Sequence, residues 1–599
     1  MKDFIKYMFA SMVGFILGYI VIFTIMFFVV IGMVAFMTSK TMKKMSDKEV
    51  SLSEKTVLKI DFIQPIADFT EDNPFVQFDF ISDEMNLPLT LKTVLDNIKR
   101  AKNDPKIIGI NLNLSIIPQN LTTLFEIRKA LVDFKKSKKF IYSYSDYYTK
   151  QGYFLASVSD SIFMQPSGIV IFTGFASEMM FFKGTFDKLN IEPKIIRAGK
   201  YKSAGESFTE YKMSKENLEQ TSALINSIYG NFINAIAESR KIDTATLRDI
   251  AKQYKVRIAK DAVTYKLVDR LIYKDQFEDM MKKLTGKDAK ASSANYITLA
   301  KYIRNSSGKE GNKSENKIAL IYAVGTIGMA DGNGESISPE RLCEAIYKAR
   351  TDDKIKAIVI RINSPGGSAL ASDIIWREVY LAKKAKPVIV SMGSVAASGG
   401  YYIASPADSI LAEATTITGS IGVFGMFVNM ENFWKNKLGI THDRYRTGKY
   451  ADFGNPNRPM TMDEEEIMKY IIGDIYSTFK THVSEGRKIS VDNVELIAQG
   501  HVWTGEQALK IRLVDKLGSL DDAIDVAKRM AKISDYKLVI LPKSKSPFDK
   551  FFRYFGMSKI KTYLLKQSLG NDYDLYSRAK AAEEMNGIYM LMPYLAEIN

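Results

Sequence analysis

The stretch 391–410, "SMGSVAASGGYYIASPADSI", places Ser398 between two alanines and two glycines at the end of an apolar run. Such small neighbours let another group approach the hydroxyl closely. A serine hydroxyl becomes a nucleophile when a nearby base removes its proton, and histidine is the usual base. The chain has only three histidines, His442, His482 and His501, and none has a recognisable triad context. Nucleophilic chemistry at Ser398 therefore needs a different base.

Lysine is the alternative, because burial disfavours the ammonium form and lowers the pKa of the amine. Lys202 lies in "GKYKSAGES" (199–207), among small residues and beside a tyrosine, which suits a packed environment. An ordinary surface role is the common one among the 83 Lys and Arg residues, and Lys200 is the obvious competitor. Lys200 has a counterpart, Lys449, in a similar segment farther on, so we assign it a structural role. We predict Lys202 as the base.

Two adjacent glycines follow another apolar run in "NSPGGS" (363–368). Gly366 and Gly367 let the backbone turn sharply and expose N–H groups, which is the arrangement that holds a developing oxyanion. Gly399, directly after the serine, is a third candidate donor. We expect the oxyanion hole to be formed from these three glycines.

A second serine, Ser420, lies in "TITGSIG" (416–422) and could orient the lysine amine through a hydrogen bond. Structural alternatives exist for both serines. Ser398 could be a small helix-start residue selected for tight packing, and Ser420 could simply cap or pack.

Four pairs of segments recur in the same order at nearly one separation along the chain, which indicates an internal duplication with a period too long for a solenoid. The pairs are 59–68 with 320–331, 106–114 with 356–364, 151–162 with 399–410, and 197–205 with 446–454.

The two copies differ where the chemistry would be. The first copy has "NLSIIP" in place of "NSPGGS", and so lacks the glycine pair. It also lacks both serines, whereas the second copy lacks the lysine. The aligned residues are Lys150 for Ser398, Phe175 for Ser420, and Ala451 for Lys202. Neither copy is complete alone, so we predict one site divided across the interface of the two copies.

Within each copy, apolar runs such as 357–363 and 387–392 alternate with helical patterns such as 337–350, which predicts βαβ units and a mainly parallel sheet. We expect an α/β protein of five parts. These are an N-terminal anchor at 1–50, a first half at 51–304 that supplies the lysine, a polar linker at 305–316, a second half at 317–540 that supplies the serine, and a basic, aromatic C-terminal tail at 541–599.

The segment from Tyr7 to Thr38 has no charged residue and exceeds the roughly 20 residues that cross a bilayer as a helix. We predict an uncleaved transmembrane helix, since a cleaved signal sequence has a shorter apolar core. Lysines lie on both sides, with more after the span than before it. The positive-inside rule would then place the body in the cytoplasm, although the rule weakens for long translocated domains. The sequence leaves this conflict open.

Bulk composition excludes several classes. Hydrophobic content of 46% and charged content of 25% exclude a disordered chain, and the single cysteine, Cys343, excludes an internal disulfide and cysteine-cluster metal sites. A net charge of +15 without a nucleic-acid-binding module favours anionic lipid as the acidic partner. The tail segment 542–567 mixes basic and aromatic residues, and could lie on lipid or dock on a neighbouring subunit.

The segments "SPGGS", "AASGGYY", "TGSIGVFG" and "GKYKSAGE" resemble the motifs of the signal peptide peptidase A family, in its long, duplicated, membrane-anchored form. The resemblance covers roughly residues 55–540. It implies two tandem domains of the Clp protease and crotonase type. It also implies Ser398 as nucleophile, Lys202 as general base, Ser420 as the residue that positions the lysine, and Gly366 and Gly367 at the oxyanion hole.

The resemblance further implies a membrane-bound serine endopeptidase that degrades cleaved signal peptides and similar apolar peptides. No metal, organic cofactor or nucleic acid is implied, and the family's ring-like assembly implies a homotetramer. We expect a single-pass protein of the bacterial inner membrane with its catalytic body on the periplasmic side. The alternatives are a crotonase-like acyl-CoA enzyme and a non-catalytic membrane scaffold, neither of which needs a reactive Ser398.

Overall fold

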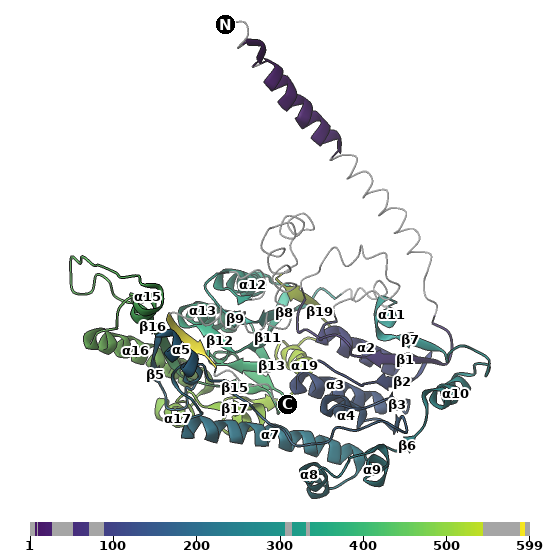
Figure 1. Cartoon of the computed structure of the whole chain (residues 1–599). Helices are drawn as coiled ribbons and strands as arrows, with labels where there is room; N and C mark the ends of the chain where they lie inside the picture. Colours follow the sequence, from purple (N-terminus) through teal and green to yellow (C-terminus); the bar gives the residue numbers. More distant parts are fainter. Residues whose placement is uncertain are drawn as a thin grey trace.

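The structure, a computed structural model, describes residues 6–8, 10–26, 52–70, 89–305, 314–330, 336–542 and 587–592. These residues form three β-sheets with helices packed around them (Figure 1).

The first half contains a parallel sheet of order β6-β4-β3-β2-β1-β7. Its strands are β1 (Thr56–Asp61), β2 (Ile107–Asn113), β3 (Phe140–Ser145), β4 (Ser161–Met164), β6 (Arg270–Leu271) and β7 (Tyr296–Thr298). The helices are α2 (Leu91–Asn103), α3 (Leu121–Lys135), α4 (Lys150–Ala156), α5 (Lys183–Leu189), α6 (Glu206–Thr209), α7 (Lys215–Arg240), α8 (Thr244–Lys252), α9 (Ala259–Thr264), α10 (Lys274–Thr285) and α11 (Leu299–Arg304). Side-chain oxygens at Thr90, Asn120 and Thr149 accept from N3 backbone N–H groups and so fix the starts of α2, α3 and α4.

The second half repeats this plan. Its sheet contains the order β18-β14-β13-β11-β8-β19, which corresponds strand for strand to β6-β4-β3-β2-β1-β7. The strands are β8 (Lys317–Val324), β11 (Ile355–Ser364), β13 (Val388–Ala397), β14 (Ser409–Ala412), β15 (Ile417–Gly419), β17 (Val502–Thr504), β18 (Lys516–Leu517) and β19 (Lys537–Leu541). The matching strand order confirms the internal duplication and the α/β class predicted from the sequence.

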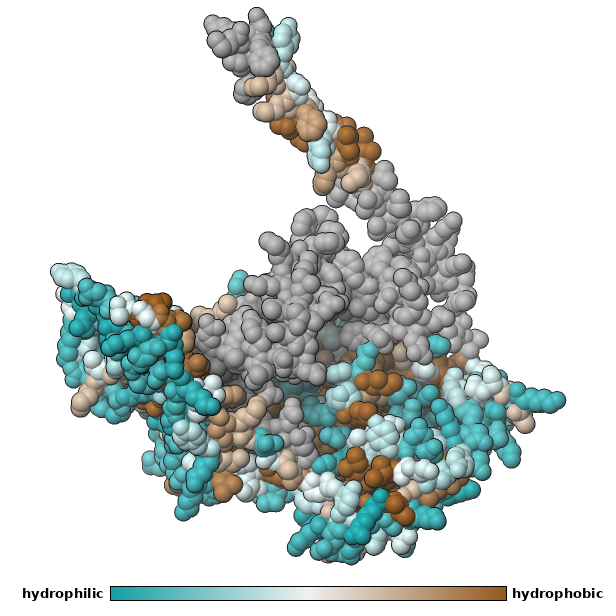
Figure 2. Space-filling view, viewed as in Figure 1, coloured by the Kyte–Doolittle hydropathy of each residue, from teal (hydrophilic) through white to brown (hydrophobic). Residues whose placement is uncertain are grey.

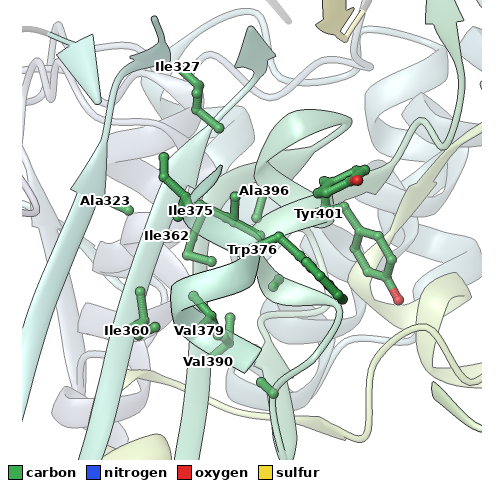
Figure 3. Packing of buried hydrophobic residues seen from close by; sticks show 14 of the residues in the cluster. Ala323, Ile327, Ile360, Ile362, Ile375, Trp376, Val379, Val390, Ala396 and Tyr401 are labelled. Atoms are coloured by element: carbon green, nitrogen blue, oxygen red, sulfur yellow. The ribbon is translucent and has the colours of Figure 1, made fainter. Parts of the chain in front are cut away.

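Helices of the second half connect these strands and cover the sheet. They are α12 (Pro339–Thr351), α13 (Ala369–Ala385), α14 (Gly399–Ala404), α15 (Glu431–Leu438), α16 (Met462–Arg487), α17 (Val491–Ile497), α18 (Gly505–Lys510) and α19 (Leu520–Met530). Figure 3 shows how α13 packs, with Ile375 and Val379 lying over Ile360 and Ile362 of β11. The predicted helix at 337–350 is α12.

A third sheet joins the two halves, and its order is β10-β9-β12-β20-β16-β5. The strands are β5 (Glu192–Ala198), β9 (Thr326–Ile327), β10 (Ser336–Ile337), β12 (Gly366–Ser368), β16 (Val423–Asn429) and β20 (Gly587–Leu591). Strand β5 belongs to the first half and pairs antiparallel with β16 over all seven residues, from Ala198 opposite Val423 to Glu192 opposite Asn429. This pairing brings the loop after β5, which carries the predicted lysine, against the second half.

A buried group of charges also joins the halves. The guanidinium of Arg361, in β11, is 1% exposed and donates to Asp68 at 2.8 Å and to Glu126 at 2.6 Å, both from the first half. Asn363, on the same strand, donates to the other oxygen of Asp68 at 2.6 Å. Because a buried charge is tolerated only with partners, these contacts hold the halves in one register.

The N-terminal helix (Lys6–Met26) projects away from the body (Figure 1), and its described side chains are exposed. Figure 2 shows apolar residues along its surface. It is long and apolar enough to cross a membrane, as predicted, and residues 27–38 of the predicted span lie outside the described residues. The tail segment 543–567 lies outside them as well.

Candidate active site

Lys202 and Ser398 meet at the interface between the two halves. The Nζ atom of Lys202 lies 2.7 Å from the Oγ atom of Ser398, and both residues are fully buried. The lysine comes from the loop after β5, and the serine stands between β13 and α14. The structure therefore brings together two residues that lie 196 positions apart in the chain.

The backbone at Ser398 turns sharply from strand to helix. Its φ is 54° and its ψ is −116°, a conformation that non-glycine residues rarely adopt. Hydrogen bonds hold it there, because the N–H donates to the Gly419 carbonyl at 2.8 Å and the carbonyl accepts from Tyr402 N–H at 2.8 Å. A strained strand-to-helix turn that presents a serine hydroxyl is a known way to build a nucleophile.

Ser420 contacts the same amine twice. Its Oγ atom and its carbonyl oxygen each lie 3.0 Å from Lys202 Nζ. A neutral lysine amine has two N–H bonds and one lone pair. If the two N–H bonds point at the two oxygens of Ser420, the lone pair is left to accept the hydroxyl proton of Ser398. Ser420 itself has a φ of 49° and is held by its N–H, which donates to the His501 carbonyl at 2.7 Å.

Burial determines the charge of the lysine. Complete removal from water lowers the pKa of Lys202 well below its usual value of 10.5. Since desolvation penalises the ammonium, burial shifts the equilibrium toward the uncharged amine, which is the form that can accept a proton. The other lysines considered differ from it. Lys200 is exposed beside the Tyr201 ring, and the amine of Lys150 donates to the Gly174 carbonyl at 3.2 Å.

Residues 498–502 of the second half form a loop that packs against the backbone of Tyr201 and Lys202. The Tyr201 N–H donates to the Gln499 carbonyl at 2.9 Å, and the Gly500 N–H donates to the Ile421 carbonyl at 2.7 Å. Gly500 lies so close that a Cβ there would be 2.6 Å from the backbone nitrogen of Lys202. Sequence reasoning missed this glycine, because its role depends on contact with a loop of the other half.

Gly500→Ala is therefore expected to lower kcat at least about 10-fold, because the added Cβ displaces the lysine backbone. Gly454→Ala is the matched control. The two glycines have φ values of 78° and 77°, but nothing lies within 4 Å of a Cβ at Gly454. Equal loss of activity in both variants would show that backbone strain, and not contact with Lys202, causes the effect.

The predicted oxyanion glycines lie beside the serine. A Cβ on Gly366 would be 2.7 Å from the Gly399 nitrogen, so these two residues are neighbours. Gly399 is the first residue of α14, where backbone N–H groups have no partner within the helix. Gly367 lies one residue farther along β12, and a Cβ there would be 2.0 Å from the Ile327 carbonyl oxygen. The Gly366 N–H donates to the Oγ atom of Ser364 at 3.2 Å, and the Gly367 nitrogen lies 3.2 Å from the position of a Cβ on Gly399, so all three predicted glycines lie in one region beside the serine.

The histidine rings pack against aromatic side chains, and that of His501 also lies edge-on to Tyr201, next to Lys202. The ring of His501 stacks on Trp503 with centroids 3.9 Å apart, and that of His482 stacks on Trp376 at 3.5 Å. Among the described residues, no group of three or more His, Cys, Asp or Glu side chains is placed to hold a metal ion.

Comparison with known proteins gives a consistent assignment. The family model described as "Peptidase family S49" matches residues 133–288 and 381–534, and the "Clp protease" model matches residues 309–417. Similar proteins include "Serine protease SPPA, chloroplastic" of Arabidopsis thaliana, which is 35% identical over 478 residues, or 78% of this chain and 70% of that protein. "Protease 4" of Haemophilus influenzae is 36% identical over 72% of each chain. "Protease 4" of Salmonella typhi is 34% identical over 75% of this chain and 73% of its own. The chain, with its two related α/β halves, therefore belongs to peptidase family S49 and is a serine peptidase.

Proposed function

We propose that Ser398 is the nucleophile of this peptidase and Lys202 its general base. The observation that carries the proposal is the distance of 2.7 Å between a fully buried amine and a serine hydroxyl held on a strained turn. Ser420 is the positioning residue, since its two oxygens direct the amine.

Acylation begins when the Oγ atom of Ser398 attacks the peptide carbonyl carbon and its proton passes to Nζ of Lys202. N–H groups of Gly367 and Gly399 stabilise the resulting oxyanion, since the Gly366 N–H already donates to the Oγ atom of Ser364. The C–N bond then breaks, and the ammonium of Lys202 transfers its proton to the departing amine. Lys202, neutral again, takes a proton from water as that water attacks the acyl ester. When the second intermediate collapses, the C–O bond to Ser398 breaks and the ammonium of Lys202 returns its proton to the departing Oγ atom, which restores the Ser398 hydroxyl and the neutral amine.

We propose that the substrates are apolar peptides, cleaved signal peptides among them, taken from the membrane by a body tethered beside it. The N-terminal helix and the motif resemblance support this assignment. Further proposals are a homotetramer and a bacterial inner-membrane location with the body on the periplasmic side. Protease digestion of the body in intact spheroplasts tests the side, and the mass of the detergent-solubilised protein by light scattering tests the assembly.

Labelling with a serine-directed fluorophosphonate tests the dyad. One label per chain is expected at Ser398, found by peptide mass mapping, and no label is expected in Ser398→Ala. Labelling should also become very slow in Lys202→Met. Ser405→Ala is the control, because this buried hydroxyl donates to the Tyr402 carbonyl at the far end of α14. Rapid labelling of Ser398 without Lys202 would exclude the lysine as its base.

Ser420→Ala is expected to lower kcat by about 10- to 100-fold while leaving KM nearly unchanged. The variant keeps the backbone carbonyl but loses one of the two acceptors, so the amine can rotate its lone pair away from Ser398. The pH profile separates a positioning role from a structural one. A positioning role shifts the pKa seen in kcat/KM, whereas a merely structural role lowers the amount of competent enzyme, counted by the label, and leaves the profile unchanged.

A further inference from the structure

Helix α7 of the first half lies against both halves of the molecule. It packs against α4 in its own half and against β17 in the second half (Figure 1). Near the N-terminus of α7, Gln220 is 1% exposed, and its side chain contacts the loop that carries Lys202. Burial of a side-chain amide costs free energy unless its polar atoms are hydrogen-bonded, so the partners of this amide show what it does.

The nitrogen of the Gln220 amide contacts the residues on both sides of the lysine. The Nε2 atom donates to the carbonyl of Tyr201 at 3.0 Å and to the Oγ atom of Ser203 at 2.9 Å. These residues directly precede and follow Lys202. The two acceptors match the two N–H bonds of the amide. Because residues 199–205 form no helix or strand, such side-chain contacts help to fix the conformation of the lysine loop.

The oxygen of the same amide reaches the second half. The Oε1 atom accepts a hydrogen bond from the Val502 N–H at 3.3 Å. A rotated amide would place its own N–H groups against this N–H, so only the observed orientation satisfies both ends. Val502 lies opposite Gly419 in the pairing of β17 with β15, and Gly419 directly precedes Ser420. One side chain therefore joins the lysine loop to the strands that carry its positioning serine.

The duplication provides an internal comparison for Gln220. Helix α16 of the second half corresponds to α7, because both are 26 residues long and both end in an arginine that pairs with an aspartate. At the position that Gln220 takes in α7, α16 has Ile467. The second copy, which has Ala451 in place of the lysine, therefore lacks the glutamine as well. The amide occurs only in the copy that has a lysine to hold.

We propose that Gln220 is a positioning residue of this peptidase, which fixes the Lys202 amine relative to Ser398 and Ser420. This inference rests on the proposed function, since it takes Lys202 as the general base. A lysine loop free to move relative to β15 and β17 would spread the amine over several positions, and few of them would let it accept the hydroxyl proton. Because its amide is fully used by protein partners, the glutamine acts through Lys202 and not on the substrate.

Gln220→Met tests the proposal, because methionine fills similar space but has no amide. The kcat per fluorophosphonate-labelled site is expected to fall about 10-fold or more, with KM nearly unchanged. Counting the label separates positioning from a structural role. A merely structural loss reduces the number of competent molecules and leaves kcat per labelled site at the wild-type value. That result, or a raised KM with normal kcat, would overturn the inference.

Asn231→Leu is the matched control. The Asn231 amide also lies on α7 and also reaches the second half, where it donates to Oε2 of Glu506 at 2.8 Å. It lies roughly three turns farther along the helix than Gln220, which is about 16 Å by the helical rise. Its kcat per labelled site should equal that of wild type. An equal fall in both variants would show that the docking of α7 in general controls the rate, which contradicts the proposal.

A double-mutant cycle with Ser420→Ala tests whether both residues act on the same amine. If they do, the combined variant should lose less kcat than the product of the two single losses, because an amine that is already misplaced has less alignment to lose. Losses that multiply would mean that Gln220 acts elsewhere, and would refute the positioning role.

Ser203→Ala provides a second variant that decides the question where Gln220→Met does not fold. It removes one of the two acceptors of the Gln220 amide and adds no bulk. A smaller fall in kcat per labelled site is expected, and no fall would overturn the inference. Failure of the proposed function is recognised separately. If wild-type enzyme takes no label at Ser398, the dyad fails, whereas normal labelling and normal kcat per site in the Gln220 and Ser203 variants exclude only the positioning role.

Discussion

Lys202→Met is expected to abolish peptide hydrolysis and, at the same time, to stabilise the folded protein at neutral pH. Methionine fills similar space but cannot accept the Ser398 proton, so kcat should fall by about 10⁴-fold or more. Lys200→Met is the matched control, because that lysine is exposed and only two residues away. A Lys202→Met enzyme with near-normal kcat would contradict the dyad.

The gain in stability follows from the pKa of Lys202. Burial lowers it well below 10.5 in the folded protein. Between this lowered value and 10.5, the unfolded chain binds a proton that the folded chain does not, so the free energy of unfolding rises with pH. The loss of stability caused by burying Lys202 is largest at pH values below the pKa of this lysine in the folded protein, and it disappears above pH 10.5. Thermal unfolding should therefore show a higher Tm for Lys202→Met at pH 7, and a smaller difference from wild type at alkaline pH.

The same pKa sets the pH dependence of the wild-type reaction. Because only the uncharged amine can act as base, kcat/KM should rise with pH through the pKa of Lys202 in the free enzyme. Titration of Ser398 labelling against pH should follow the same curve. A rate that fell as pH rose from acid to neutral would be inconsistent with a lysine base.

Arg361→Met is expected to cost about 3–5 kcal/mol of the free energy of unfolding, because it leaves Asp68 and Glu126 buried without their cation. Burial already raises the pKa of Glu126, which shows how poorly the site tolerates that charge. Urea unfolding followed by circular dichroism measures the change.

The control for this experiment is Arg350→Met. Arg350 pairs with Glu378 within the second half, where both side chains are partly exposed, so its loss should cost at most about 1 kcal/mol. Addition of Asp68→Asn and Glu126→Gln to Arg361→Met should recover part of the stability, because the stranded charges are then removed. A cost for Arg361→Met no larger than that of the control would mean that these contacts do not hold the halves together.

The meeting of Lys202 and Ser398 could be predicted because the duplication provides an internal comparison. Each copy shows what the other lacks, and this contrast distinguished Lys202 from Lys200 and Ser398 from ordinary small residues. The βαβ pattern likewise predicted the two parallel sheets, since it depends on local periodicity. In the structure, the strand order of the second-half sheet corresponds to that of the first-half sheet.

The third sheet could not be predicted in this way. The pairing of β5 with β16, the support from Gly500 and the insertion of β20 all depend on contacts between segments far apart in the chain. In β20 the sequence "GIYML" gives only a short apolar run after a basic, aromatic tail. The two roles expected for residues 542–567, on lipid or on a neighbouring subunit, stay predictions, because residues 543–567 lie outside the described part of the chain.

The division of the dyad between halves has a consequence for biosynthesis. The first half leaves the ribosome with an amine but no nucleophile, and the second half begins to emerge only after the first is complete. Until β16 pairs with β5, the nascent chain has no assembled proteolytic centre. With the dyad as proposed, the nascent chain cannot hydrolyse a peptide before β16 has emerged and paired with β5.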